Sequence, residues 1–326
     1  MKLLISTIVY GQVYGGIFLN QHLKSILDHS NLPSIVKTCE VRYILYTDHQ
    51  TKFLIEYHPR WIELSKLVKT EIKLFNTNLN FEGRYNYLST MMIDSMKIAM
   101  EGDYILSPIA ADLYFAKDFY PRILKRFKKG YDSVLVTGMR SSAEAMIPRL
   151  NQSEGALTDI ELFNFGYECL HPLWIACHWD ASQFSRIPYV LLWNAYPGFM
   201  LRAFSVTPIA FIPNNEMLSC NMIDADVPYH CKKPFWATDW IDAPVMGIEP
   251  LECFYPPFIN HKSSTKYVGL DFASKAVHPK QFQFLNVKSF FPCKEKVKLS
   301  EKQIKESDNV VREILEYVES PNLEIS

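Results

Sequence analysis

The stretch Glu101-Gly-Asp-Tyr-Ile-Leu-Ser-Pro-Ile-Ala-Ala-Asp-Leu-Tyr-Phe115 decides the fold of this 326-residue chain. Its centre, residues 104–109, is mostly apolar, which is typical of a buried strand. A helical pattern over about residues 87–100 precedes it, and a single carboxylate, Asp112, follows it. Because open α/β sheets bind ligands beyond the carboxyl ends of their strands, Asp112 is a candidate site residue.

Strands and helices alternate on both sides of this stretch. Such alternation indicates βαβ units and predicts an α/β fold, with a Rossmann-like, mostly parallel central sheet flanked by helices. The apolar patterns predict strands at 3–9, 41–46, 70–75, 104–109 and 133–137, and helices over about 18–27, 61–67, 87–100 and 119–127.

The periodicity weakens after about residue 140. Residues 141–160 are interpreted as a polar loop region, and residues 163–260 as helices and loops with one short strand at 209–212. Ser300 and Gln303 fit a capping box, which predicts a C-terminal helix that packs on the body. These patterns divide the chain into residues 1–140, 141–298 and 299–326.

Composition narrows the class of protein. The 34 basic and 35 acidic side chains nearly cancel, which argues against a nucleic-acid partner. The seven cysteines are scattered and odd in number, so a secreted disulfide framework is disfavoured and a cytoplasmic location is expected. No window approaches the roughly 18 to 20 apolar residues of a membrane span, although a peripheral membrane contact stays compatible with the sequence.

The sequence contains no P-loop, no GxGxxG fingerprint and no GxSxG elbow. An α/β hydrolase or phosphatase is disfavoured because a nucleophile motif is missing. Gly11, Gly15 and Gly16 follow the first expected strand and would let the backbone approach a phosphate or a base. A plain strand-to-helix turn explains these glycines equally well.

Three segments follow one another in an order that is typical of one enzyme family. They are this glycine loop, then Tyr46-Thr-Asp48 at the end of the second strand, and then Gly102-Asp-Tyr-Ile-Leu followed by Ala-Ala-Asp-Leu113. Residues 1–140 thereby resemble a GT-A-type glycosyltransferase. A weaker resemblance, to glycosyltransferase-like proteins of polysaccharide clusters, continues through Gly198-Phe-Met-Leu-Arg-Ala-Phe204 and Thr207-Pro-Ile-Ala-Phe-Ile-Pro213. The resemblance implies a nucleotide-sugar donor bound by residues 1–140 and a glycan or lipid-linked acceptor bound by residues 141–298. The implied activity is sugar transfer in surface polysaccharide synthesis.

The resemblance also implies roles for individual residues. Tyr10, Asp48 and Arg84 would bind the nucleotide, and Asp112 would hold the donor diphosphate or a divalent metal ion, Mg²⁺ or Mn²⁺. Ala110 stands where the family has its first acidic residue, so the need for a metal stays open. For the same reason, a non-catalytic relative that binds a glycan or a protein is the alternative function.

Asp224 and Asp226 have the literal D-x-D spacing and are candidate metal ligands, with a polar turn as the alternative. Asp239 lies between Trp236 and Trp240, a setting that suits a sugar ring, although buried aromatics with a capping aspartate explain it equally well. An inverting transferase needs a base for the acceptor hydroxyl, and Asp239 is preferred. The other candidates for this base are Asp180, Glu216 and Asp242.

Overall fold

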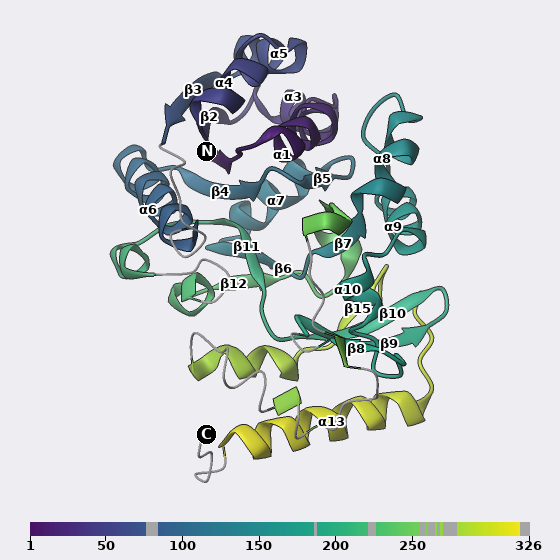
Figure 1. Ribbon diagram of the computed structural model, residues 1–326. Coiled ribbons are helices and arrows are strands. Elements are labelled where there is room, and N and C mark those ends of the chain that lie inside the picture. The colour runs from purple at the N-terminus through teal and green to yellow at the C-terminus, as the bar shows by residue number, and fades with distance from the viewer. Residues whose placement is uncertain are drawn as a thin grey trace.

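The computed structural model describes residues 1–75, 84–185, 188–220, 226–253 and 279–319, together with 258–259, 265 and 268–269. A seven-stranded sheet forms its centre, with helices on both faces (Figure 1). The strand order is β12-β6-β11-β4-β1-β2-β3. The predicted α/β class with a mostly parallel central sheet is confirmed. The strands are β1 (Lys2–Ile8), β2 (Glu40–Thr47), β3 (Lys69–Leu74), β4 (Ile105–Ala110), β6 (Ser133–Val136), β11 (Thr207–Phe211) and β12 (Pro234–Trp236).

Four neighbouring strands, β3, β2, β1 and β4, run parallel, and β6 and β12 form a further parallel pair. The exception is β11, which is antiparallel to both β4 and β6. Since β11 and β12 come from beyond residue 140, the two predicted halves of the chain share one sheet. The division at residue 140 stays a prediction.

Both faces of β1 are buried because successive side chains of a strand point to opposite sides. Leu3 and Ile5 pack in one cluster with α1 (Gln12–Ile17), η1 (Phe18–His22), α2 (Leu23–Ile26) and α7 (Phe119–Lys128). Leu4 packs on the other face against α6 (Arg84–Gly102). This double burial explains why the sequence of the first strand hardly alternates between apolar and polar residues.

The helix α6 faces the sheet as its sequence predicts, since Met91, Ser95 and Ala99 are buried. Asp94 lies on the more exposed side of α6 and accepts hydrogen bonds from Tyr46 Oη and Lys73 Nζ, both at 2.6 Å. The pairing anchors α6 over β2 and β3.

The expectation that residues 141–160 form a loop is wrong. They complete β7 (Met139–Ser142) and form α8 (Ala143–Asn151) and the start of α9 (Asp159–Glu168). Ser142 Oγ accepts from the Ala145 amide at the start of α8, and Thr158 forms a capping box with Glu161 at the start of α9. Pro148, inside α8, breaks the helical pattern at the sequence level.

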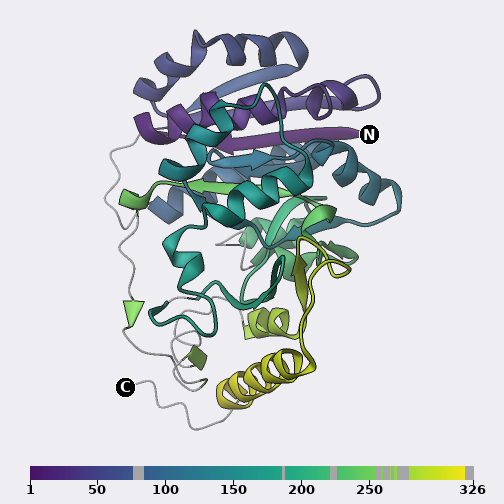
Figure 2. The ribbon, with the colours of Figure 1, turned by 90° about the vertical axis from the view of Figure 1, so that its right-hand side faces the viewer.

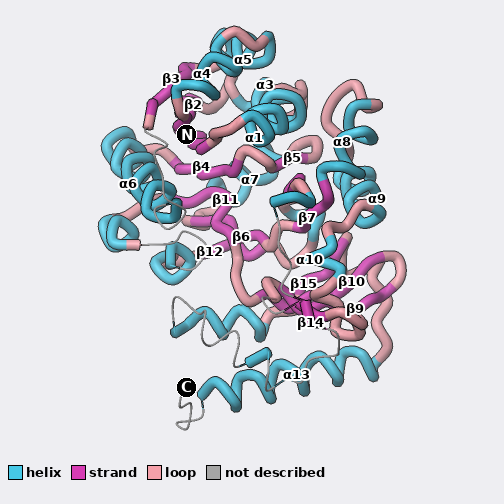
Figure 3. Tube along the Cα trace, viewed as in Figure 1, coloured by secondary structure: helices cyan, strands magenta, loops and turns pink. Residues whose placement is uncertain are grey.

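The expectation of one strand between residues 163 and 260 is also wrong. Besides β11 and β12, this region holds β8, β9, β10, β13 and β14 (Figure 3). With β5, β7 and β15 from outside the region, they build two small sheets, ordered β15-β10-β9 and β5-β13-β7, and the two-stranded pair of β8 and β14. Several of these strands are buried along both faces, so they lack the alternation that reveals a half-exposed strand. Their bounds are β5 (Leu113–Phe115), β8 (Phe184–Ser185), β9 (Val190–Ala195), β10 (Gly198–Ala203), β13 (Val245–Glu249), β14 (Phe258–Ile259) and β15 (Ser289–Phe291).

The C-terminal helix α13 (Glu301–Glu319) begins at the predicted capping box, in which the Ser300 amide and hydroxyl donate to Gln303 Oε1. Val310 and Ile314 are buried in a cluster with residues of β9 and β10, so the helix packs on the body (Figure 2). No helix in the described part of the chain combines the length and apolar character needed to cross a lipid bilayer. The remaining helices are α3 (Leu32–Ile35), α4 (His49–Glu56), α5 (Pro59–Leu67), α10 (Pro172–Ile175) and the short 3₁₀ segments η3 (Asn215–Ser219), η4 (Val227–His230), η5 (Trp240–Asp242), η6 (Leu251–Cys253) and η7 (Pro279–Asn286).

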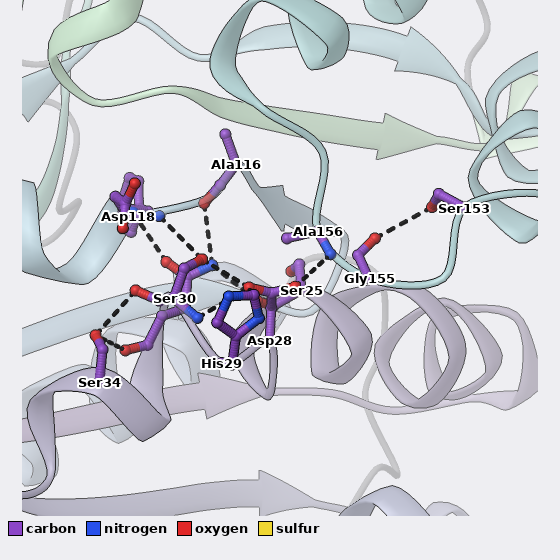
Figure 4. Close-up of polar contacts among 12 residues, drawn as sticks. Ser25, Asp28, His29, Ser30, Ser34, Ala116, Asp118, Ser153, Gly155 and Ala156 are labelled. Carbon is purple, nitrogen blue, oxygen red and sulfur yellow. Dashed lines mark hydrogen bonds and ion pairs between the residues drawn. The ribbon is translucent and has the colours of Figure 1, made fainter.

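A buried carboxylate, Asp28, ties the first helical layer to the loop after α8 (Figure 4). Its Oδ1 accepts from the amide and hydroxyl of Ser30, and its Oδ2 accepts from the Ala156 amide at 2.9 Å. Burial alone would raise the pKa of Asp28, but these hydrogen bonds outweigh it and lower the pKa below the ordinary value. The carboxylate is therefore a charged anchor inside the fold.

Replacement of Asp28 with alanine is expected to lower the free energy of unfolding by about 2 to 3 kcal/mol, because charge-assisted bonds are lost and the Ala156 amide stays buried. Urea unfolding followed by circular dichroism measures this change in the free energy of unfolding. The matched control is His29→Ala, which removes only the solvent-exposed partner of Asp28, 3.5 Å away and 88% exposed; this change should alter the free energy of unfolding by less than about 0.5 kcal/mol. Equal effects of the two substitutions would contradict the anchoring role.

Candidate functional site

The order of the parallel strands places a crevice at one position of the central sheet. From β1 the chain passes to β2 and β3 on one side and then returns to β4 on the other side. At such a reversal the two connections leave in opposite directions, and a crevice opens beyond the carboxyl ends of the two strands. In this chain that crevice lies between the ends of β1 and β4.

A cavity of about 400 Å³ lies at this position, and we call it the switch-point cavity. Its floor comes from the ends of β1 and β4 and from β11, and α6 forms one wall. Most of the lining is apolar with a few polar groups, as in many sites for small ligands. The residues that contribute from these four elements are Ser6, Ile8, Pro108, Ile109, Ala110, Thr207, Ile209, Leu88, Ser89, Met92 and Met96.

Asp112 and Arg140 are the charged residues among those described that line the cavity. Asp112 lies in the turn between β4 and β5, where its carbonyl oxygen accepts from the Ile248 amide at 2.8 Å. Arg140, on β7, donates from Nη1 to Glu249 Oε2 at 2.7 Å. The cavity therefore has one charged end, built from β7, β13 and the β4–β5 turn.

Strand pairing explains how Arg140 meets Glu249. The strands β7 and β13 are parallel, with Arg140 opposite Gly247. Glu249 is two residues further along β13, so its side chain points to the same face as the Gly247 position. A side chain at position 247 would begin 3.3 Å from Arg140 Cγ, and glycine leaves this space to the arginine.

The electrostatics of this end follow from partial burial. Burial raises the pKa of Asp112 above the ordinary value; the charge of Arg140 opposes this shift and that of Glu249 reinforces it. Burial disfavours the charged form of Arg140, but Glu249 and Asp112 outweigh it and raise the pKa of the guanidinium. Arg140 is therefore a permanent cation at the edge of the cavity.

The residues predicted to bind the nucleotide lie at the same edge of the sheet. Asp48 caps α4 by accepting from the amide and hydroxyl of Thr51 at 2.8 and 2.7 Å, and Thr51 Oγ1 also accepts from the Gly11 amide. Burial would raise the pKa of Asp48, but the hydrogen bonds from Thr51 lower it. Gly11 has a φ of 78°, a conformation that favours glycine. Asp48 thus holds the loop between β1 and α1 beside the cavity.

Tyr10 follows β1 and meets Phe75 edge to face, with ring centroids 5.9 Å apart. Phe75 follows β3, so this aromatic pair spans the carboxyl ends of the three strands β1, β2 and β3. Neither Tyr10 nor Asp48 is among the cavity-lining residues. Arg84 begins α6, and its side chain lies outside the described residues.

The acidic residues of the second half lie elsewhere. Asp239 accepts from the Lys294 amide at 2.9 Å, and Asp242 pairs with Arg126 of α7 at 2.7 Å. Asp180 is exposed after α10, and none of these three lines the switch-point cavity. Asp226, which precedes η4, and Glu216, paired with His230, do not line it either, and Asp224 lies outside the described residues. The roles predicted for them stay predictions.

The described residues do not fit a divalent cation. No group of three or more His, Cys, Asp or Glu side chains in the described part of the chain is arranged to hold a metal ion. In the cavity, Asp112 has a guanidinium as its charged neighbour, and Ala110 provides no second carboxylate. The predicted Mg²⁺ or Mn²⁺ site, with Asp112, Asp224 and Asp226 as ligands, stays a prediction.

The sequence patterns do not identify two residues of the charged end, Arg140 and Glu249, as site residues. Their pairing depends on β7 and β13, and neither strand was predicted. One signal was available, because Glu249 ends an apolar run at residues 245–248. A lone charge that ends such a run is a candidate for a buried ion pair.

Comparison with known proteins gives structural neighbours among transferases. No protein-family model and no curated protein matches the sequence. Solved structures with partial likeness include a protein described as a glucose-1-phosphate thymidylyltransferase from Bacillus anthracis, at 10% identity and a TM-score of 0.28. Mouse xyloside xylosyltransferase 1 has 7% sequence identity and a TM-score of 0.29, and mannose-1-phosphate geranyltransferase from Thermus thermophilus has 8% identity and a TM-score of 0.24.

These matches cover 43%, 48% and 44% of this chain, and the chain spans 55%, 63% and 41% of the three neighbours, respectively. At such low identities and TM-scores the likeness carries no argument about activity. The functional conclusion therefore depends on the site itself.

Proposed function

We propose that this chain is a glycosyltransferase that binds a nucleotide-diphosphate sugar at the switch-point cavity and moves the sugar to a glycan or lipid-linked acceptor. One observation carries the proposal: a mostly apolar cavity with a charged end lies where the order of parallel strands reverses. This position in a parallel sheet is where ligands such as nucleotides bind. The acceptor would belong to surface polysaccharide synthesis, as the sequence resemblance implies.

The site offers different surfaces for the parts of such a donor. The loop at Gly11, held by Asp48, and the aromatic pair of Tyr10 and Phe75 would receive the nucleoside. The sugar and diphosphate would extend into the cavity toward Asp112, whose carboxyl group would accept hydrogen bonds from sugar hydroxyls. Binding in this order would place the anomeric carbon near the charged end.

The alternative is a non-catalytic protein of the same fold that binds a glycan or a protein. Ala110 favours it, because this exposed residue at the cavity stands where a metal-binding carboxylate is expected. The two functions differ in the ligand that stabilises the fold. A transferase must bind a nucleotide donor, whereas a glycan-binding protein need not.

Thermal unfolding with a panel of UDP- and GDP-sugars is expected to show at least one donor that raises the midpoint by several degrees. A ligand at 100 times its Kd adds about 2.7 kcal/mol to the free energy of unfolding. The free monosaccharides serve as controls and should give no comparable shift. If no nucleotide sugar shifts the midpoint, with or without Mn²⁺, the transferase proposal is wrong.

A further inference from the structure

The cation at the charged end of the switch-point cavity is positioned by strand pairing. Arg140 lines the cavity, while its partner Glu249 is 5% exposed and is not among the lining residues. The carboxylate therefore lies behind the guanidinium, away from the cavity. Its ion pair at 2.7 Å restricts where the arginine can point.

The guanidinium keeps donors for a ligand after this pairing. Arginine carries five N–H groups, and the bond to Glu249 uses one on Nη1. The side chain of Arg140 is 40% exposed, so part of the group faces open space. Two parallel N–H donors fit two phosphate oxygens in a fork, which is the geometry that makes arginine selective for phosphate.

A divalent cation would find few ligands at the same place. Asp112 is the one carboxylate among the described residues that line the cavity, because Ala110 offers none and Glu249 is held by Arg140. Arg140 instead offers its remaining N–H donors to a bound diphosphate. Glu249 is not among the lining residues, so a ligand in the cavity would meet the guanidinium and not this carboxylate.

We infer that Arg140, braced by Glu249, is the group that binds the donor diphosphate, and that donor binding needs no divalent metal ion. This inference depends on the proposed function, because it names the charge that holds the proposed donor. Arg140 would act by direct contact with the phosphate oxygens. Asp112 is then left to bind sugar hydroxyls instead of a metal.

Isothermal titration of the full chain with UDP and GDP, in EDTA and in Mn²⁺, tests the inference. The better of the two ligands should bind with the same Kd, within about threefold, in both buffers. Arg140→Ala should weaken binding about 10- to 100-fold, as expected for loss of a charge-assisted pair. Arg140→Lys keeps a cation against Glu249 but not the fork, so it should fall between wild type and Arg140→Ala.

The matched control is Arg149→Ala on α8. Arg149 forms an exposed ion pair with Glu168, and neither residue lines the cavity, so this substitution should leave the Kd unchanged. Thermal midpoints without ligand identify any variant that fails to fold, and Arg140→Lys keeps the test valid if Arg140→Ala fails. Binding that appears with Mn²⁺ alone, or wild-type affinity in both Arg140 variants, would overturn the inference and leave the proposed function standing. No binding of either nucleotide in either buffer would overturn both.

Discussion

Replacement of Ala110 with tryptophan is expected to weaken nucleotide-sugar binding by more than about 100-fold while the fold stays intact. Ala110 is the last residue of β4, is exposed, and lines the switch-point cavity, so an indole at this position would occupy the space proposed for the donor. A donor that is excluded from the cavity loses the contacts it would make there, at a cost of several kcal/mol in binding free energy. Each 1.4 kcal/mol is a factor of ten in Kd. Titration with the most stabilising donor measures the loss.

The control places the same side chain in a second groove, between α1 and α8. Val13 is 58% exposed and lines that groove, together with Gln21, Glu144 and Ile147. Val13→Trp should bind the donor as wild type does. If Val13→Trp loses binding and Ala110→Trp keeps it, the donor site lies in the second groove and the proposed position is wrong.

Replacement of Gly198 with alanine is expected to lower the free energy of unfolding by about 3 kcal/mol or more. A Cβ at this first residue of β10 would lie 1.9 Å from the carbonyl oxygen of Phe291 on the paired strand β15. The obstacle is backbone, so it cannot rotate away, and the two strands must separate. Overpacking of this kind commonly costs 1 to 3 kcal/mol, and loss of strand pairing adds to the cost.

Urea unfolding of Gly198→Ala should be compared with that of Gly16→Ala in α1. A Cβ at Gly16 would meet nothing within 4 Å, and alanine favours a helix over glycine, so this control should change the free energy by less than about 1 kcal/mol and in the stabilising direction. An unfolding midpoint of Gly198→Ala that matches wild type would show that β10 and β15 are not paired as closely as described.

The first half of the fold follows from the sequence because its signals are strong and local. Residues 3–9 are mostly apolar and hardly alternate, and the helix over 87–100 presents Met91, Ser95 and Ala99 on one face. The later elements could not be predicted in the same way. β9, β10 and β13 are short and buried on both faces, and Pro148 interrupts the pattern of α8.

The residues of the candidate site likewise fall into some that the sequence identifies and some that it does not. Asp112 could be identified because it directly follows a strong strand, and Asp48 because it follows another. Arg140 and Glu249 are 109 residues apart, and they meet through the parallel pairing of β7 and β13, which no local pattern encodes. The sequence also does not show that Asp48 is engaged as a helix cap by Thr51.

Hydrogen–deuterium exchange with the most stabilising nucleotide sugar tests most directly whether the donor binds at the switch-point cavity. Slower exchange is expected at residues 8–12, which include Ile8 of the cavity and the Gly11 loop, and at 109–113 and 138–140, which line the cavity at the end of β4 and the start of β7. Exchange in α13, on the far side of the body, should stay unchanged. Unchanged exchange in those three segments, with slower exchange at residues 143–151 beside the second groove or elsewhere, would contradict the account.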